Sequence, residues 1–290
     1  MISRDLPVPM DYATDLSSVT PRSIRKARIA ILIFMLMGLG LFASGLAWNF
    51  STRRYLTGFA DAIIPLDGSP EEKTEALAEW FHHEPARMAL SDMGYAGALS
   101  YRDPVNIVRN GRLLKICGSA SNAFMNLADA AGLKVRRLLL LDPSGNVMHV
   151  VAEVNLGDRW AVVNPQQGLL FKDRFGHVLT KEELRNPEVF EDAISHMPGY
   201  SPQYRFDHTI YIHLERIPIA GRYLRRVLNR FAPGWEQAIN WSYFMEHPSL
   251  WLLLASLVLF LLGIAASLTL NRYSRRPLHV GIWHGLSARE

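Results

Sequence analysis

Cysteine is almost absent from this sequence, since Cys117 is the only one among 290 residues. A single cysteine excludes an intramolecular disulfide, so this thiol is an inert buried group, a bridge to another chain or a reactive group. The sequence also lacks internal repeats, low-complexity tracts, histidine spacings of the His-Glu-x-x-His type and any basic stretch interleaved with aromatic residues. We therefore predict no metal, no cofactor and no nucleic-acid partner.

Charge is absent from two long runs, residues 29–48 and residues 250–270. At 1.5 Å per residue each run is long enough to cross a hydrocarbon layer of about 30 Å. Neither run has the polar face that a core helix of a soluble protein normally shows. The first run could instead be a cleaved signal peptide, but the 28 residues before it and its own length favour a retained anchor. We predict two transmembrane helices at these positions.

The charges flanking the two runs predict the orientation of the chain. The nearest cations are Arg22, Arg25, Lys26 and Arg28 before the first run, Arg53 and Arg54 after it, and Arg272, Arg275 and Arg276 after the second. By the positive-inside rule, the tails 1–28 and 271–290 are then cytoplasmic, and residues 51–248 form an extracytoplasmic domain. We expect a bacterial-type inner membrane, with this domain in the periplasm.

The distribution of charge agrees with that topology. Residues 51–248 hold 22 Lys and Arg against 23 Asp and Glu, whereas the rest of the chain holds 9 against 4. The net charge of +4 therefore resides in the terminal segments. We interpret it as a consequence of membrane topology and not as a surface for nucleic acid.

Capping boxes predict the starts of two helices in the extracytoplasmic domain. The first is Ser69-Pro70-Glu71-Glu72, which opens a helix that we expect to end before Pro85. The second is Thr180-Lys181-Glu182-Glu183. A third helix, over residues 219–231, is amphipathic, with arginines along one side. Its arginine-bearing face is either solvated or docked on the lipid of the membrane interface.

Residues 113–171 carry the clearest pattern of the chain. Apolar residues and the cysteine recur at helical spacing up to a glycine stop, in the order Cys117, Ala120, Phe124, Leu127, Ala131 and Gly132. Three strands follow, over 135–141, 147–156 and 159–164, and turns at 142–145 and at 157–158 join them. The pattern predicts an α+β domain in which an antiparallel sheet packs on the helix that bears the cysteine.

The second hairpin allows a prediction of register. If Gly157 and Asp158 are its two loop residues, Asn164 lies opposite Val151, on the face that also carries His149. His149 and Asn164 are then diagonal neighbours about 7–8 Å apart, close enough for their side chains to meet. A loop of three residues would instead place them on opposite faces.

A thiol, an imidazole and an amide in this order can form a Cys-His-Asn relay for acyl transfer. In such a relay a helix N-terminus lowers a thiol's pKa, His149 would take the proton of Cys117, and Asn164 would orient the ring. Taken singly, each residue has a commoner explanation: a buried thiol, a satisfied half-buried histidine and a strand end. Glu153, on the same strand as His149, is expected to be a structural partner for a nearby arginine.

This segment resembles the transglutaminase-like core, a part of the papain-like cysteine-enzyme superfamily. The matching pieces are Ile116-Cys117-Gly118, Gly132-Leu133 with Arg136, His149 with Glu153-Val154, and Trp160 with Asn164-Pro165. The resemblance implies a nucleophilic Cys117, a general base His149 and an orienting residue at 164. Two features depart from the family pattern, namely Lys115-Ile116 ahead of the thiol and Asn164 where the family more often has Asp.

Two functions from different classes follow. The first is a membrane-anchored hydrolase or acyltransferase, which forms a thioester on Cys117 and acts on a peptide, a protein or another amide-containing envelope substrate. The second is a catalytically inactive transglutaminase-like module that binds a peptide or glycan in an envelope or surface-glycan assembly. A third, a membrane scaffold, would not need residues 113–171 at all.

Overall fold

The computed structural model describes residues 21–88, 102–214, 221–238 and 246–275. The chain divides into two units, the first made of residues 1–44 with 253–290 and the second of residues 45–252. Most of the predicted cytoplasmic tails, 1–28 and 271–290, lies outside the described residues. Each unit is described by itself below.

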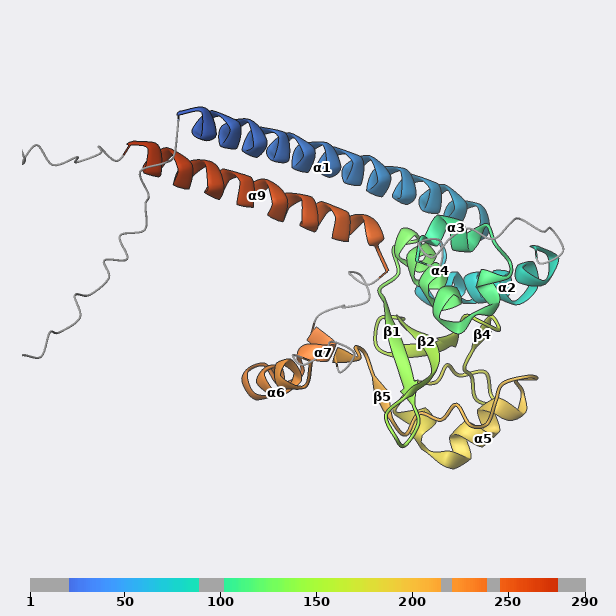
Figure 1. Cartoon of the computed structure of the whole chain (residues 1–290). Coiled ribbons are helices and arrows are strands. Elements are labelled where there is room, and N and C mark those ends of the chain that lie inside the picture. Colours follow the sequence, from blue (N-terminus) through green and yellow to red (C-terminus); the bar gives the residue numbers. More distant parts are fainter. Residues whose placement is uncertain (1–20, 89–101, 215–220, 239–245, 276–290) are drawn as a thin grey trace, which may run out of the picture. The chain divides into compact units, whose positions relative to one another are not determined.

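The first unit consists of two antiparallel helices lying side by side, formed by parts of α1 (Pro21–Ile63) and α9 (Pro248–Arg275) (Figure 1). Arg28 Nη2 donates a hydrogen bond to Asn271 Oδ1 at 3.3 Å. The two helices pack closely at Gly263 of α9, because a Cβ at this position would lie 2.5 Å from Cγ of Met35 on α1. Small residues thus allow the two helices to approach.

Both helices are long and apolar enough to cross a membrane. Only 11% of the most apolar window of each helix is buried, so neither resembles the core helix of a soluble protein. The helices cover the predicted spans 29–48 and 250–270. α1 continues well beyond Trp48 and ends at Ile63, where Leu56 and Ala60 pack into the core of the second unit.

The second unit is an α+β domain around a five-stranded antiparallel sheet in the order β4-β3-β2-β1-β5. The strands are β1 (Val135–Leu141), β2 (Val147–Asn155), β3 (Trp160–Asn164), β4 (Leu169–Leu170) and β5 (Thr209–Ile210). The three longer strands agree with the predicted ones. The sequence pattern did not reveal the two short edge strands.

The register predicted for the second hairpin is confirmed. Asn155 pairs with Trp160 and Ala152 with Val163, a register that continues to Val151 opposite Asn164. Leu156 N donates to Arg159 O at 2.9 Å, which closes a turn whose two residues are Gly157 and Asp158. Gly157 has a φ of +115°, a conformation open to glycine but strained for other residues.

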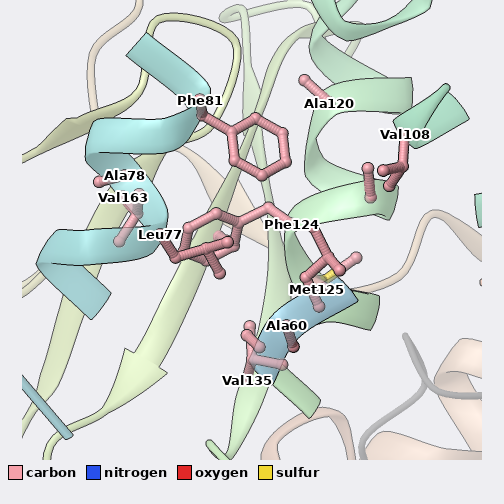
Figure 2. Packing of buried hydrophobic residues seen from close by; sticks show 14 of the residues in the cluster. Ala60, Leu77, Ala78, Phe81, Val108, Ala120, Phe124, Met125, Val135 and Val163 are labelled. Atoms are coloured by element: carbon pink, nitrogen blue, oxygen red, sulfur yellow. The ribbon is translucent and has the colours of Figure 1, made fainter. Parts of the chain in front are cut away.

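Helices cover one face of the sheet, and their side chains form the helical-face cluster (Figure 2). These helices are α2 (Pro70–Met88), α3 (Pro104–Val108) and α4 (Cys117–Ala130), with a 3₁₀ turn at Leu113–Lys115. The cluster joins Leu77, Phe81, Ala120, Phe124 and Leu127 from the helices to Val135, Ala152, Val154 and Val163 of the sheet. Phe81 and Phe124 meet edge to face, with ring centroids 5.6 Å apart.

The start of α2 confirms the predicted capping box. Glu72 N donates to Ser69 Oγ, and Ser69 N donates to Glu72 Oε2 at 2.7 Å. The predicted end of this helix before Pro85 is wrong, since α2 continues to Met88. A proline removes one backbone hydrogen bond and kinks a helix without always ending it.

The opposite face of the sheet carries the aromatic-face cluster. Leu138, Leu140, Val151 and Val162 of the sheet pack there against Phe171, Phe190, Tyr200, Phe206 and Tyr211. α5 (Pro187–Ser195) belongs to this side, capped by the Asn186 side chain. The Thr180 capping box forms as predicted, but it opens only a 3₁₀ turn (Glu183–Arg185). The described residues of this unit also form α6 (Gly221–Phe231) and α7 (Trp235–Ala238).

Candidate active site

His149 and Asn164 meet at the centre of the sheet. His149 Nε2 lies 3.2 Å from Asn164 Oδ1, although fifteen positions separate the two residues in sequence. The side chains are on neighbouring strands, β2 and β3, as the register requires. Only 2% of His149 and 1% of Asn164 is exposed. A buried imidazole needs such a partner, because an unpaired ring N–H away from water is costly.

The hydrogen bonds beyond Asn164 determine which nitrogen of His149 carries the proton. Gln167 Nε2 donates to the Gly199 carbonyl at 2.6 Å, so Gln167 Oε1 is left as an acceptor. Asn164 Nδ2 donates to that oxygen at 2.8 Å, which turns Asn164 Oδ1 towards His149. His149 must then donate through Nε2–H, and the neutral ring keeps an unprotonated Nδ1. That is the tautomer that a general base requires.

Aromatic rings cover His149. The ring of Tyr204 is parallel to the imidazole, with an interplanar angle of 5° and centroids 4.4 Å apart. Tyr200 meets it edge to face at 6.2 Å. Burial lowers the pKa of His149 below its ordinary 6.5, and the hydrogen bond to Asn164 opposes this effect only in part. Burial thus favours the neutral form of the imidazole.

Cys117 is the first residue of α4, and Ile116 precedes it as an N-cap without a side-chain hydrogen bond. The first backbone N–H groups of a helix have no partner within the helix, so those at Cys117 and Gly118 point towards the start of α4. The cysteine is half-buried and Ile116 is 46% exposed. Apart from the chain neighbours and the backbone of α4 itself, no described atom lies within 4 Å of a Cβ built on Gly118. The thiol thus stands at an open helix end.

The thiol and the imidazole approach the sheet from different sides. α4 packs on the helical face, whereas His149 shares its face with Val151 of the aromatic-face cluster. Among the described residues, Cys117 makes no hydrogen bond to His149 or to Asn164. The structure therefore joins two of the three predicted site residues directly and leaves the third without a bond to them.

Two contacts nevertheless connect the start of α4 to the histidine pair. Gln166, two residues after Asn164, donates through Nε2 to the carbonyl of Lys115 at 2.7 Å. Ser121, one helical turn after Cys117, donates through Oγ to the carbonyl of Val150 at 3.1 Å. The residue after His149 and a residue two positions after Asn164 thus contact the segment that carries the thiol.

Glu153 has the structural role that the sequence suggested. Its carboxylate accepts a hydrogen bond from Arg136 Nε at 2.8 Å, and its side chain is fully buried. The Arg136 guanidinium lies over Trp160 at 3.9 Å and over Tyr211 at 4.5 Å. Because Glu153 is committed to this ion pair, it does not take part in the His149 relay.

Several residues around this site were not predicted from the sequence. Gln167 and Tyr204 define the tautomer and the burial of His149. Glu246, just before α9, is buried and pairs with Arg137 and with the amide of Asn122 on α4. Local patterns could not reveal these residues, because their partners are distant in the chain.

No protein-family model, no curated protein and no solved structure matches the chain. Within the described ranges, no group of three or more His, Cys, Asp or Glu side chains is arranged to hold a metal ion.

Proposed function

We propose that this protein is a membrane-anchored cysteine enzyme with a transglutaminase-like core, which transfers acyl groups through a thioester on Cys117. The observation that carries the proposal is the buried His149–Asn164 hydrogen bond, with a tautomer that leaves Nδ1 of His149 free to accept a proton. A satisfied structural histidine could use either tautomer. The chain of bonds through Asn164 and Gln167 instead fixes one tautomer and one ring orientation, as a general base that acts through Nδ1 requires.

The proposed reaction begins with attack of Cys117 Sγ on the carbonyl carbon of an amide, while His149 Nδ1 takes the thiol proton. The C–N bond then breaks, the amine leaves with the proton from His149, and a thioester remains on the sulfur. Water or a second amine attacks the thioester and gives its proton to His149. Release of the acid or of the new amide returns the proton to Cys117.

The start of α4 supports the first of these steps. The unpaired N–H groups at Cys117 and Gly118 stabilise a thiolate and offer donors to the oxyanion that forms on the carbonyl. The exposed Ile116 and the open space beside Gly118 give a substrate access. No hydrogen bond joins Cys117 to His149 among the described residues, so the mechanism requires the start of α4 and the His149 ring to come together when a substrate is bound.

The two apolar helices support an anchor in the membrane, and the cations that flank them support cytoplasmic termini. We propose that residues 51–248 face the periplasm of a bacterial-type cell and that the substrate is a peptide, a protein or another amide of the cell envelope.

The single cysteine allows a clean test. Detergent-purified full-length protein is alkylated with iodoacetamide across a pH series, and modification is measured by intact mass. We expect the folded wild-type thiol to react faster at pH 7 than a free cysteine does. His149→Ala should slow the reaction at pH 7. Cys117→Ser is the blank, and it should take up no label.

A thiol that reacts only after unfolding, or one whose profile is the same in the wild type and in His149→Ala, would contradict the proposal. Acyl transfer itself is tested with p-nitrophenyl acetate. An acetyl group on the Cys117 peptide in the wild type, absent in Cys117→Ser and reduced in His149→Ala, is the expected result.

A binding module without activity is the second candidate. The stacking of Tyr204 on His149 and the missing bond between thiol and imidazole favour it. In that case Cys117 behaves as an ordinary thiol, His149→Ala leaves its reactivity unchanged, and no acyl adduct accumulates.

A further inference from the structure

α6 (Gly221–Phe231) is held to its domain by a narrow strip of side chains. Leu228 packs against the small cluster formed by Ile212, Leu214 and Trp235. Arg225 forms an ion pair with Glu236 and donates through Nη2 to the carbonyl of Ile212 at 2.7 Å. Gly221, Arg225 and Leu228 lie within about one-quarter of the helix circumference. Beside this strip, Asn229 Oδ1 accepts a hydrogen bond from Trp235 Nε1 at 2.8 Å. The remaining residues of α6 are exposed among the described residues.

Large apolar side chains occupy one sector of the uncovered surface. Tyr223 is 67% exposed, Leu224 41%, Val227 51% and Phe231 81%. At 100° per residue these four positions lie within a sector of roughly 100°. A helix that faces only water would carry polar residues there, and a contiguous exposed apolar stripe marks a contact surface.

Arginines occupy the sector beside the apolar stripe. Arg222, Arg226 and Arg230 recur at helical spacing, and α6 contains no acidic residue. None of the three forms an ion pair among the described residues, and Arg226 lies over the Tyr223 ring at 5.8 Å. An apolar stripe flanked by cations is typical of helices that lie in the interface of an anionic membrane.

We propose that α6 is an interfacial helix, which inserts its stripe of Tyr223, Leu224, Val227 and Phe231 between the phospholipids of the membrane that holds the chain's own apolar helices. Arg222, Arg226 and Arg230 then bind the phosphates of anionic lipid headgroups. The short chain segment between α6 and the apolar helix α9 favours the membrane over a protein partner as the surface that α6 contacts. Only sixteen residues separate Phe231 from Pro248, the first residue of α9, which limits their separation to about 60 Å.

The consequence is a third attachment of the domain to the bilayer, in addition to the two apolar helices. A docked α6 would present one constant side of the domain to the membrane.

The test uses the full-length chain in lipid nanodiscs, with Cys117→Ser as the background so that one engineered cysteine carries a fluorescent label. Val227→Cys and Phe231→Cys report on the stripe. Phe175→Cys is the matched control, because Phe175 is also apolar and 71% exposed but lies in a turn of the same domain. Quenching by aqueous iodide and by a lipid-bound nitroxide is measured with phosphatidylglycerol-rich and with pure phosphatidylcholine nanodiscs.

We expect the labels at 227 and 231 to be protected from iodide and quenched by the lipid nitroxide in anionic nanodiscs, while the label at 175 shows the reverse. Replacing Arg222, Arg226 and Arg230 by Gln should lower the ratio of docked to free helix by roughly 10- to 100-fold. Iodide quenching at 227 equal to that at 175 would overturn the proposal. Protection without lipid quenching would overturn it too, because another protein surface would then cover the stripe.

Discussion

The two faces of the sheet are built differently, and the candidate site depends on both. The helical face is covered by α2, α3 and α4, whose cluster includes Ala120, Ala123 and Ala128 beside Phe124. The aromatic face is covered mainly by turns and one short helix, with five aromatic rings in its cluster. The thiol belongs to an element of the first face and the imidazole to the second. Their alignment therefore requires both clusters to be intact.

The largest effects should come from removing one ring from each cluster. Phe124 and Phe206 are both fully buried, one on each side of the sheet. We expect Phe124→Ala and Phe206→Ala each to lower the free energy of unfolding by about 3–5 kcal/mol, because each leaves a cavity. Urea unfolding of the detergent-solubilised chain, followed by circular dichroism, measures this loss. Phe175→Ala, at an exposed position, is the control and should change stability by less than about 0.5 kcal/mol.

The pair of variants also tests whether the two faces unfold together. A shared sheet predicts a single transition in both variants. Separate transitions, or a large loss in only one variant, would mean that the faces are independent units. The alignment of thiol and imidazole would then not depend on both.

The sequence predicted those elements whose structure depends on residues close together in the chain. Helix α4, the three long strands and the turn at Gly157-Asp158 each have a periodic or turn pattern, and the register that joins His149 to Asn164 follows from them. β4 and β5 have two residues each, so only their pairing partners define them. The side of the sheet on which α4 packs was also beyond the sequence, because a strand buried on both faces does not reveal which face a helix selects.

The surroundings of the site were unpredictable for a related reason. Gln167 bonds to Gly199 and Tyr204 stacks on His149, although 32 and 55 positions separate these pairs in sequence. Such contacts arise from packing and leave no local signature. The residues that could be predicted are the reacting groups of the proposed mechanism, whereas the residues that could not be predicted set the protonation and burial of His149.

An intermediate effect is expected from Gln167→Leu, which tests whether the aromatic side controls the tautomer of His149. Leucine removes the acceptor for Asn164 Nδ2, so the Asn164 amide is free to rotate and to present its NH₂ group to the imidazole. We expect a second tautomer with the proton on Nδ1, a loss of stability of about 1–2 kcal/mol, and slower alkylation of Cys117 at pH 7. Nitrogen shifts of ¹⁵N-histidine-labelled protein, assigned with His149→Asn, identify the tautomer.

Gln166→Leu is the matched control for that variant. It removes the hydrogen bond to the Lys115 carbonyl but leaves the Asn164–Gln167 contact in place. The tautomer should therefore remain that of the wild type. A Gln167→Leu protein with an unchanged tautomer would show that the Gln167 relay does not determine the protonation of His149.

The smallest effect, and the one that best separates the two faces, is the pH dependence of stability due to His149. Burial lowers its pKa below 6.5 in the folded state, so between that lowered value and 6.5 the unfolded chain binds more protons than the folded one. The stabilisation is complete above pH 6.5 and is lost progressively as the pH falls through this window. Glutamine at position 149 cannot titrate, so the urea midpoint of His149→Gln should decline less than that of the wild type over the same pH range.

The opposite sign would be a wild type that gains stability relative to His149→Gln as the pH falls below 6.5. It would mean that the folded protein favours an imidazolium. Because burial disfavours that charge, a nearby anion such as the Cys117 thiolate would be needed to produce the reversal. The sign of this difference thus tells whether the imidazole rests as a neutral base on the aromatic face or as half of an ion pair that reaches across to α4.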